Sequence, residues 1–223
     1  MNSLASLNTQ NTIELTHAAM ATSPIILCEI YKPEHHIVVW QRQLAKALKT
    51  DIAHCVKNAS DLNINACIET KSIAADVSSA LKKLSQFTYL KNNIVELVDM
   101  FCCLFELQRV GLRLRVLTHA MCPRFHVDRV PCRLVTTFAG RGSEWLPHHG
   151  VDRCKLGAGN QGLSDEKSGL YADHDIIQTL NVGDVALLKG ETWLGNENMG
   201  IVHRSPRLKK DEKRLLLTLD FID

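Results

Sequence analysis

The sequence predicts an α+β fold, with helices packed outside a β-sandwich or barrel core. Up to about residue 109, apolar side chains recur every three to four residues, as on the buried face of a helix. Beyond that point, short segments alternate apolar and polar side chains, and turn residues separate them. Helices followed by a run of strands are typical of this class. We therefore divide the chain into a flexible N-terminus (1–22), a helical part that packs on the core (23–109) and the core itself (110–223).

The composition is that of an ordinary globular protein. The chain has 223 residues, of which 45% are hydrophobic and 22% are charged, so it can bury a substantial core. Its 26 basic and 24 acidic residues nearly balance, which argues against a strong attraction to nucleic acid or to a membrane surface. Residues 1–15 lack the segments of a signal peptide, and no apolar run reaches the roughly 18 residues of a membrane span. We expect a cytoplasmic protein without a membrane partner.

The eight cysteines are expected to be reduced, and most of them to be small core residues. The chain has no Cys-x-x-Cys pair, which argues against a zinc ribbon or a thioredoxin-type site. The basic stretch 204–214 has no interleaved aromatic residues, so it gives no clear signal for nucleic acid. The sequence specifies no oligomeric state.

One strand and three helices are expected before residue 110. The apolar run 24–28 predicts the strand. The first helix should begin at Pro33 and extend to about residue 57, because proline suits the first helical position. The second covers 73–84, and Asn93 could cap the third.

Six short strands are expected in the core, with a long polar segment among them. The strands are 112–116, 125–128, 132–138, 184–188, 201–203 and 214–221. Residues 150–174 contain five glycines and few apolar side chains. So long a polar segment inside a domain is either a functional loop or lid, or a disordered surface insertion.

The most informative feature is the pair His126 and Asp128, with His203 75 residues after Asp128. Side chains on a strand alternate between its faces, so His126 and Asp128 should point to the same side. The third group must then come from another strand, which His203 can supply. Two imidazoles and one carboxylate are the facial triad that binds non-haem Fe(II) and leaves coordination positions open. Downstream, Arg214 opens the last expected strand, where its guanidinium could hold a carboxylate.

His126-x-Asp128, His203 and an arginine eleven residues later resemble the signature of the Fe(II)/2-oxoglutarate-dependent dioxygenases, over about residues 110–223. The resemblance implies a double-stranded β-helix (jelly-roll or cupin-like) core, with Fe(II) held by the two histidines and the aspartate. It further implies 2-oxoglutarate as co-substrate, with its far carboxylate on Arg214, and the hydroxylation or oxidation of a substrate that the sequence does not specify. Arg133 and Arg141 are other carboxylate anchors that such a fold could use.

The longer strings 122–129, 183–193 and 202–206 are also similar to an uncharacterised bacterial domain-of-unknown-function family. That second resemblance implies little about chemistry.

Two other functions stay open. His148, His149 or Cys122 could replace or add to the triad, and such a closed set would favour zinc. The protein would then be a non-catalytic zinc-binding or sensing protein on a cupin-like fold. In a metal-free interaction module, His126 would be an ordinary core histidine. Trp193 could line a pocket or belong to the core.

Overall fold

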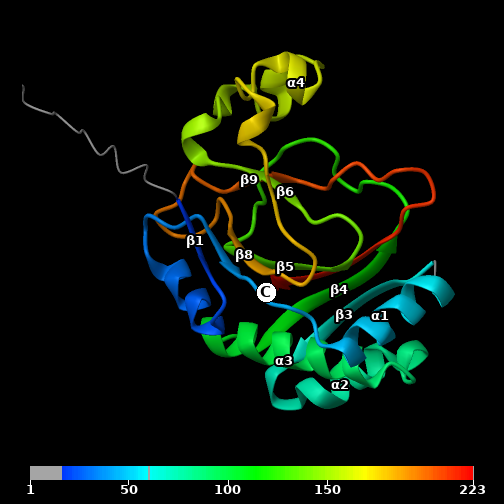
Figure 1. The fold of residues 1–223 in the computed structure, drawn as a ribbon. Helices are drawn as coiled ribbons and strands as arrows, with labels where there is room; N and C mark the ends of the chain where they lie inside the picture. Colours follow the sequence, from blue (N-terminus) through cyan, green and yellow to red (C-terminus); the bar gives the residue numbers. More distant parts are fainter. Residues whose placement is uncertain (1–16, 60, 223) are drawn as a thin grey trace, which may run out of the picture.

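Mixed helix and sheet with a strand-rich core is the architecture that the sequence predicts, and it is confirmed. The computed structural model describes residues 17–59 and 61–222. Figure 1 shows a large sheet in the middle of the molecule, with a smaller sheet on one side and helices on the other. The large sheet has the order β1-β2-β8-β5-β10-β4-β3, and the small sheet has the order β7-β6-β9. All pairings are antiparallel except that of β1 with β2.

The strands of the large sheet are β1 (Ala18–Ala21), β2 (Ile37–Trp40), β3 (Asn63–Glu69), β4 (Arg109–Leu117), β5 (Cys132–Ala139), β8 (Val185–Lys189) and β10 (Arg214–Phe221). Those of the small sheet are β6 (Glu144–Leu146), β7 (Gln178–Thr179) and β9 (Val202–Arg204). The large sheet thus takes strands from both sides of residue 110. Within the expected flexible N-terminus, residues 18–21 form β1, and residues 1–16 lie outside the described part.

The two faces of the large sheet have different partners, and β10 illustrates this. Leu215, Leu217 and Leu219 belong to the main apolar core, which they share with the helices α1 (Lys46–Asn58), α2 (Ile73–Ala80) and α3 (Thr88–Phe105). Leu216 points the other way, into a second core that includes Trp145 of the small sheet. Alternation along a strand produces this division. The described helices include none with both the length and the hydropathy needed to cross a membrane.

Three local predictions before residue 110 are wrong. Residues 24–28 form no strand but part of the 3-10 helix η1 (Pro24–Tyr31). The expected helix 33–57 is β2 followed by α1, because the run 37–40 is buried between β1 and β8, and a short apolar run fits either period. The third helix begins at Thr88, before Asn93, since the Asp51 carboxylate of α1 accepts the N–H groups of Tyr89 (2.7 Å) and Leu90 (3.1 Å).

Residues 150–174 form an ordered excursion above the small sheet (Figure 1). Leu170 and Tyr171 pack with Phe125, Leu146 and Val202 in a third apolar cluster. Of the two alternatives that the sequence leaves open for this segment, the packing favours a folded loop over a disordered insertion. The short helices here and elsewhere are α4 (Asp165–Ser168), η2 (Thr70–Ser72), η3 (Lys82–Leu84), η4 (His148–Gly150), η5 (Arg153–Lys155), η6 (Gly157–Asn160) and η7 (His174–Ile176).

All eight cysteines are free thiols in the structure. The prediction that most of these cysteines are core residues is wrong. Cys55, Cys102 and Cys132 are buried, whereas the other five are exposed.

Candidate metal centre

His126, Asp128 and His203 come together beside β9. One ligand atom from each residue lies within 4.8 Å of the other two. Nε2 of His203 is 3.3 Å from Asp128 Oδ2, and Nε2 of His126 is 3.8 Å from Asp128 Oδ1. In the described part of the chain, no other group of three metal-ligating side chains comes so close together. The three residues that the spacing singled out are thus neighbours in space.

A single antiparallel bridge positions the two histidines. The N–H of His126 donates to the His203 carbonyl (3.0 Å), and the N–H of His203 donates to the His126 carbonyl (2.9 Å). The strand predicted over 125–128 is therefore wrong, since only one residue of this segment pairs. Pro123 and Pro131 flank it, and proline interrupts a ladder because it has no N–H to donate.

Backbone carbonyls orient both imidazoles. Nδ1 of His126 is 2.9 Å from the Arg124 carbonyl, and Nδ1 of His203 is 3.1 Å from the Ile201 carbonyl. A carbonyl only accepts, so each Nδ1 carries a proton, and each Nε2 is left facing the Asp128 carboxylate, where a metal ion would replace any proton on it. Metal-ligating histidines are usually held in this way by their second nitrogen.

The Asp128 carboxylate is fixed by Arg133, whose Nη1 donates to Oδ2 at 2.7 Å. Arg133 in turn donates through Nε to Asp220 (2.6 Å), so the pair is anchored to the large sheet. Burial by itself would raise the pKa of Asp128, but the hydrogen bond from His203 and the charge of Arg133 hold it well below its usual range. Burial and the neighbouring His203 lower the pKa of His126.

The lowered pKa values of Asp128 and His126 suit a metal. A divalent ion needs an ionised carboxylate and neutral imidazoles. Two nitrogens and one oxygen are the donors that non-haem iron takes with open positions. A cavity of about 420 Å³ lies against both imidazoles and could admit further ligands. The residues present therefore fit a 2-His-1-carboxylate centre.

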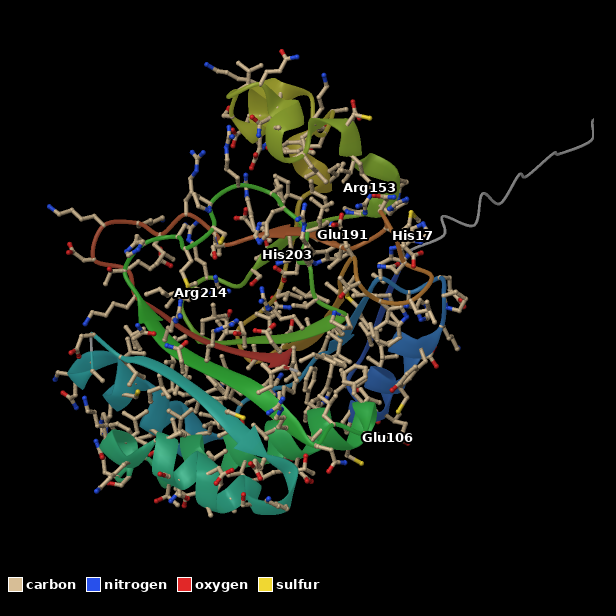
Figure 2. All side chains as sticks on the ribbon, turned by 180° about the vertical axis from the view of Figure 1, so that it is seen from behind. His17, Glu106, Arg153, Glu191, His203 and Arg214 are labelled. Carbon is tan, nitrogen blue, oxygen red and sulfur yellow. The ribbon has the colours of Figure 1, made fainter. Side chains whose placement is uncertain are left out.

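Arg214 is almost completely buried, at 1% exposure. Its Nη2 donates to the hydroxyls of Ser143 (2.7 Å) and Thr137 (2.9 Å). Within the described residues, no carboxylate forms an ion pair with it. Burial lowers its pKa to about 10, against a smaller opposing effect of the Glu144 charge. Ser143 lines the cavity, so Arg214 lies one side chain behind the cavity wall. Figure 2 shows Arg214 to the left of His203.

The other predicted site residues are dispersed. Cys122 lines the cavity but is not part of the close ligand group. Arg133 is bound to Asp128, and the exposed Arg141 pairs with Glu212 at 3.4 Å. Trp193 does not line the cavity; it packs against Phe105, with ring centroids 6.0 Å apart.

His148 joins a second group of histidines instead of the triad. Its ring centroid is 5.1 Å from that of His17 and 5.4 Å from that of His36. Nδ1 of His148 accepts from Arg153 at 3.1 Å. In Figure 2 the labelled His17 and Arg153 lie together, to the right of His203. His149, the adjacent residue, is exposed.

Sequence reasoning missed the roles of three residues at the site. The role of Arg133 as the partner of Asp128 was not foreseen, nor was that of Thr137 and Ser143 as partners of Arg214. Alternation along β5 places Arg133, Val135 and Thr137 on one face, and this signal was available in the sequence. Nothing local marks Ser143.

The chain belongs to the family described as "Protein of unknown function (DUF1826)", whose sequence model matches residues 21–220. The resemblance to an uncharacterised family is thus confirmed. No curated protein matches the chain.

Solved structures that resemble the chain include oxygenases. A dioxygenase for auxin oxidation in rice is 12% identical with a TM-score of 0.48, covering 83% of this chain and 72% of that one. A Pseudomonas putida prolyl-4-hydroxylase is 12% identical with a TM-score of 0.39, covering 88% and 96%. The Fe(II)/(alpha)ketoglutarate-dependent dioxygenase TqaL is 14% identical with a TM-score of 0.42, covering 79% and 74%.

Proposed function

We propose that this protein is a non-haem Fe(II) oxygenase that uses 2-oxoglutarate and is built on a double-stranded β-helix, or jelly-roll, core. The observation that carries the proposal is the orientation of the two imidazoles. Each has Nδ1 on a backbone carbonyl, and Nε2 of each lies within 4 Å of the Asp128 carboxylate. When bound, Fe(II) would supply the activation of O2 for the oxidation of a substrate C–H bond.

The protein's own groups have distinct tasks in this proposal. His126, Asp128 and His203 hold the ion. Arg133 keeps the carboxylate ionised and in position, because it donates to Oδ2 and is itself fixed by Asp220. Loss of such a supporting contact usually weakens metal binding by about 10- to 100-fold.

We assign the far carboxylate of 2-oxoglutarate to Arg214. Its guanidinium is buried without an ion-pair partner among the described residues, and its hydrogen-bond partner Ser143 lines the cavity. A carboxylate that joins or displaces the Ser143 hydroxyl would offset this charge. An arginine can bind a carboxylate through two parallel hydrogen bonds, which fixes orientation as well as affinity.

Anaerobic titration with Fe(II) and then 2-oxoglutarate tests the proposal. The expected result is a weak visible charge-transfer band that disappears in His126→Ala and weakens in Arg214→Ala. His149→Ala is the matched control, because His149 is an exposed histidine outside the triad. A band of normal intensity in His126→Ala would contradict the assignment.

The zinc alternative makes a different prediction in the same experiment. It predicts no band, together with tight Zn(II) binding that is lost in Cys122→Ser or His149→Ala. That result would replace the oxygenase by a metal-binding or sensing protein.

A further inference from the structure

The cavity beside the triad has an unusual lining. Four arginines and two histidines contribute to it, and no aspartate or glutamate does. The arginines are Arg113, Arg115, Arg133 and Arg204. A lining of this kind attracts an anion, provided that the arginines do not already form ion pairs with carboxylates of the protein.

Three of the four arginines are neutralised in this way. Arg113 forms an ion pair with Asp220. Arg133 is shared between Asp128 (2.7 Å) and Asp220 (2.6 Å). Arg204 donates to carboxylates at 2.6 and 3.1 Å, those of Glu144 and Asp165. These three guanidiniums therefore have little remaining capacity for a ligand.

Arg115 differs from them. Its Nη2 donates to the amide oxygen of Asn65 (3.0 Å), and its Nη1 contacts the sulfur of Met121 (3.5 Å). Both partners are neutral, and its buried Nε has no hydrogen-bond partner. No carboxylate within the described ranges forms an ion pair with Arg115. A guanidinium has five N–H donors, so Arg115 can still bind an anion through two of them.

Arg115 is also distinct from the proposed co-substrate anchor. In the pairing of β4 with β10, Arg115 lies opposite Leu216, whereas Arg214 lies opposite Leu117. The two arginines therefore lie on neighbouring strands and on the same face of the sheet, and their positions along the strands differ by two residues. Arg115 forms part of the cavity wall itself, whereas Arg214 is behind Ser143.

We infer that the substrate is a small anionic molecule whose carboxylate or phosphate group binds Arg115. This inference rests on the proposed function, because it takes the cavity beside the triad as the place of the reaction. A volume of about 420 Å³ suits a small molecule. Val135, Leu188 and Leu216 give the cavity apolar walls, so the substrate has an apolar part next to its anionic group.

Calorimetric titration of the metal-free full chain with inorganic phosphate, and separately with propionate, tests the inference. At least one probe should bind, and Arg115→Gln should weaken its binding by about tenfold or more, because a charge-assisted pair is lost. The preferred probe distinguishes a phosphate from a carboxylate substrate. Arg113→Gln is the matched control on the same strand and cavity wall, and should change affinity by less than about threefold, since Arg113 is already paired with Asp220.

The charge-transfer titration of the same variants separates this inference from the proposed function. The inference predicts that Arg115→Gln keeps the 2-oxoglutarate band. Probe binding that is unchanged in Arg115→Gln, or absent in the wild type, overturns it while the band persists. A band lost in Arg115→Gln and kept in Arg214→Ala overturns it too, because Arg115 would then be the co-substrate anchor. Absence of the band from every protein, with probe binding that still needs Arg115, refutes the oxygenase and supports the anion site.

Discussion

Replacing Arg214 by methionine should stabilise the free protein and weaken co-substrate binding. Arg214 is 1% exposed, and its hydrogen-bond partners are the hydroxyls of Thr137 and Ser143. A buried charge without a counter-ion is costly, and apolar replacements of similar volume are often stabilising. Methionine is similar in length and adapts to an irregular space. The same substitution removes the only group that we assign to the far carboxylate of 2-oxoglutarate.

The size of the effect follows from the pKa of Arg214. Burial lowers this pKa from 12.5 to about 10. One unit corresponds to about 1.4 kcal/mol, so the charged form is destabilised by about 3 kcal/mol in the folded protein. Both values lie well above 7, and the whole penalty is therefore present at neutral pH. Losing the hydrogen bonds to the two hydroxyls would cost about 1 kcal/mol each. The net expectation is a gain of about 1 kcal/mol in the free energy of unfolding.

Urea denaturation of the metal-free proteins would measure this gain. Arg141→Met is the matched control: Arg141 is exposed and pairs with Glu212, so its loss should change the free energy of unfolding by less than about 0.5 kcal/mol. A free energy of unfolding that falls by about 1 kcal/mol or more in Arg214→Met would refute the view that this charge lacks compensation. A stabilised variant with an unchanged 2-oxoglutarate band would instead refute its role as the anchor.

Two further predictions concern stability and its pH dependence. In Gly190→Ala the new Cβ would lie 1.9 Å from the Val130 carbonyl oxygen and 2.8 Å from that of Asp128, so the segment that carries Asp128 must move. Unfolding should become easier by about 2 kcal/mol and Fe(II) affinity should fall, and an unchanged affinity would contradict this. Burial, with the charges of His17, His148 and Lys189, lowers the pKa of His36 from 6.5 to about 4. The contribution of neutral His36 to stability is therefore fully present above pH 6.5 and is lost as the pH falls toward 4. His36→Asn, which keeps a donor for the Met199 carbonyl, should reduce the loss of stability between pH 7.5 and 5 by about 2 kcal/mol, and denaturation curves of equal pH dependence would count against it.

The triad could be predicted because its signal is chemical and robust to errors in local structure. His126 and Asp128 were placed together on the assumption of a strand, which the structure does not contain. They still meet, since two residues separated by one position in an extended segment point the same way, whether or not their neighbours pair. His203 needed only a true strand, and 202–204 is one.

The errors lie where distant parts of the chain decide local structure. The start of α3 depends on the Asp51 carboxylate, 38 residues before Tyr89. The segment 37–40 is a strand because β1 and β8 bury it from both sides, and nothing within it excludes a helix. His148 was an alternative ligand for the triad, but its place depends on contacts with His17 and His36, which no pattern around it reveals.

The alternation along β10 explains how one strand supports both the fold and the candidate site. Leu215, Leu217 and Leu219 face the helices and belong to the main core, so the helix-side face of β10 provides hydrophobic stabilisation. The opposite face, toward the small sheet, presents Arg214 and Asp220, which contribute little to stability by burial but position charges near the cavity. Asp220 fixes Arg133, whereas Arg214 has no such partner among the described residues. A charge left uncompensated in so well-packed a strand is costly to the free protein, and an anionic ligand would remove that cost on binding. This difference between the two arginines is why Arg214, and not Arg133, is the stronger candidate for the co-substrate.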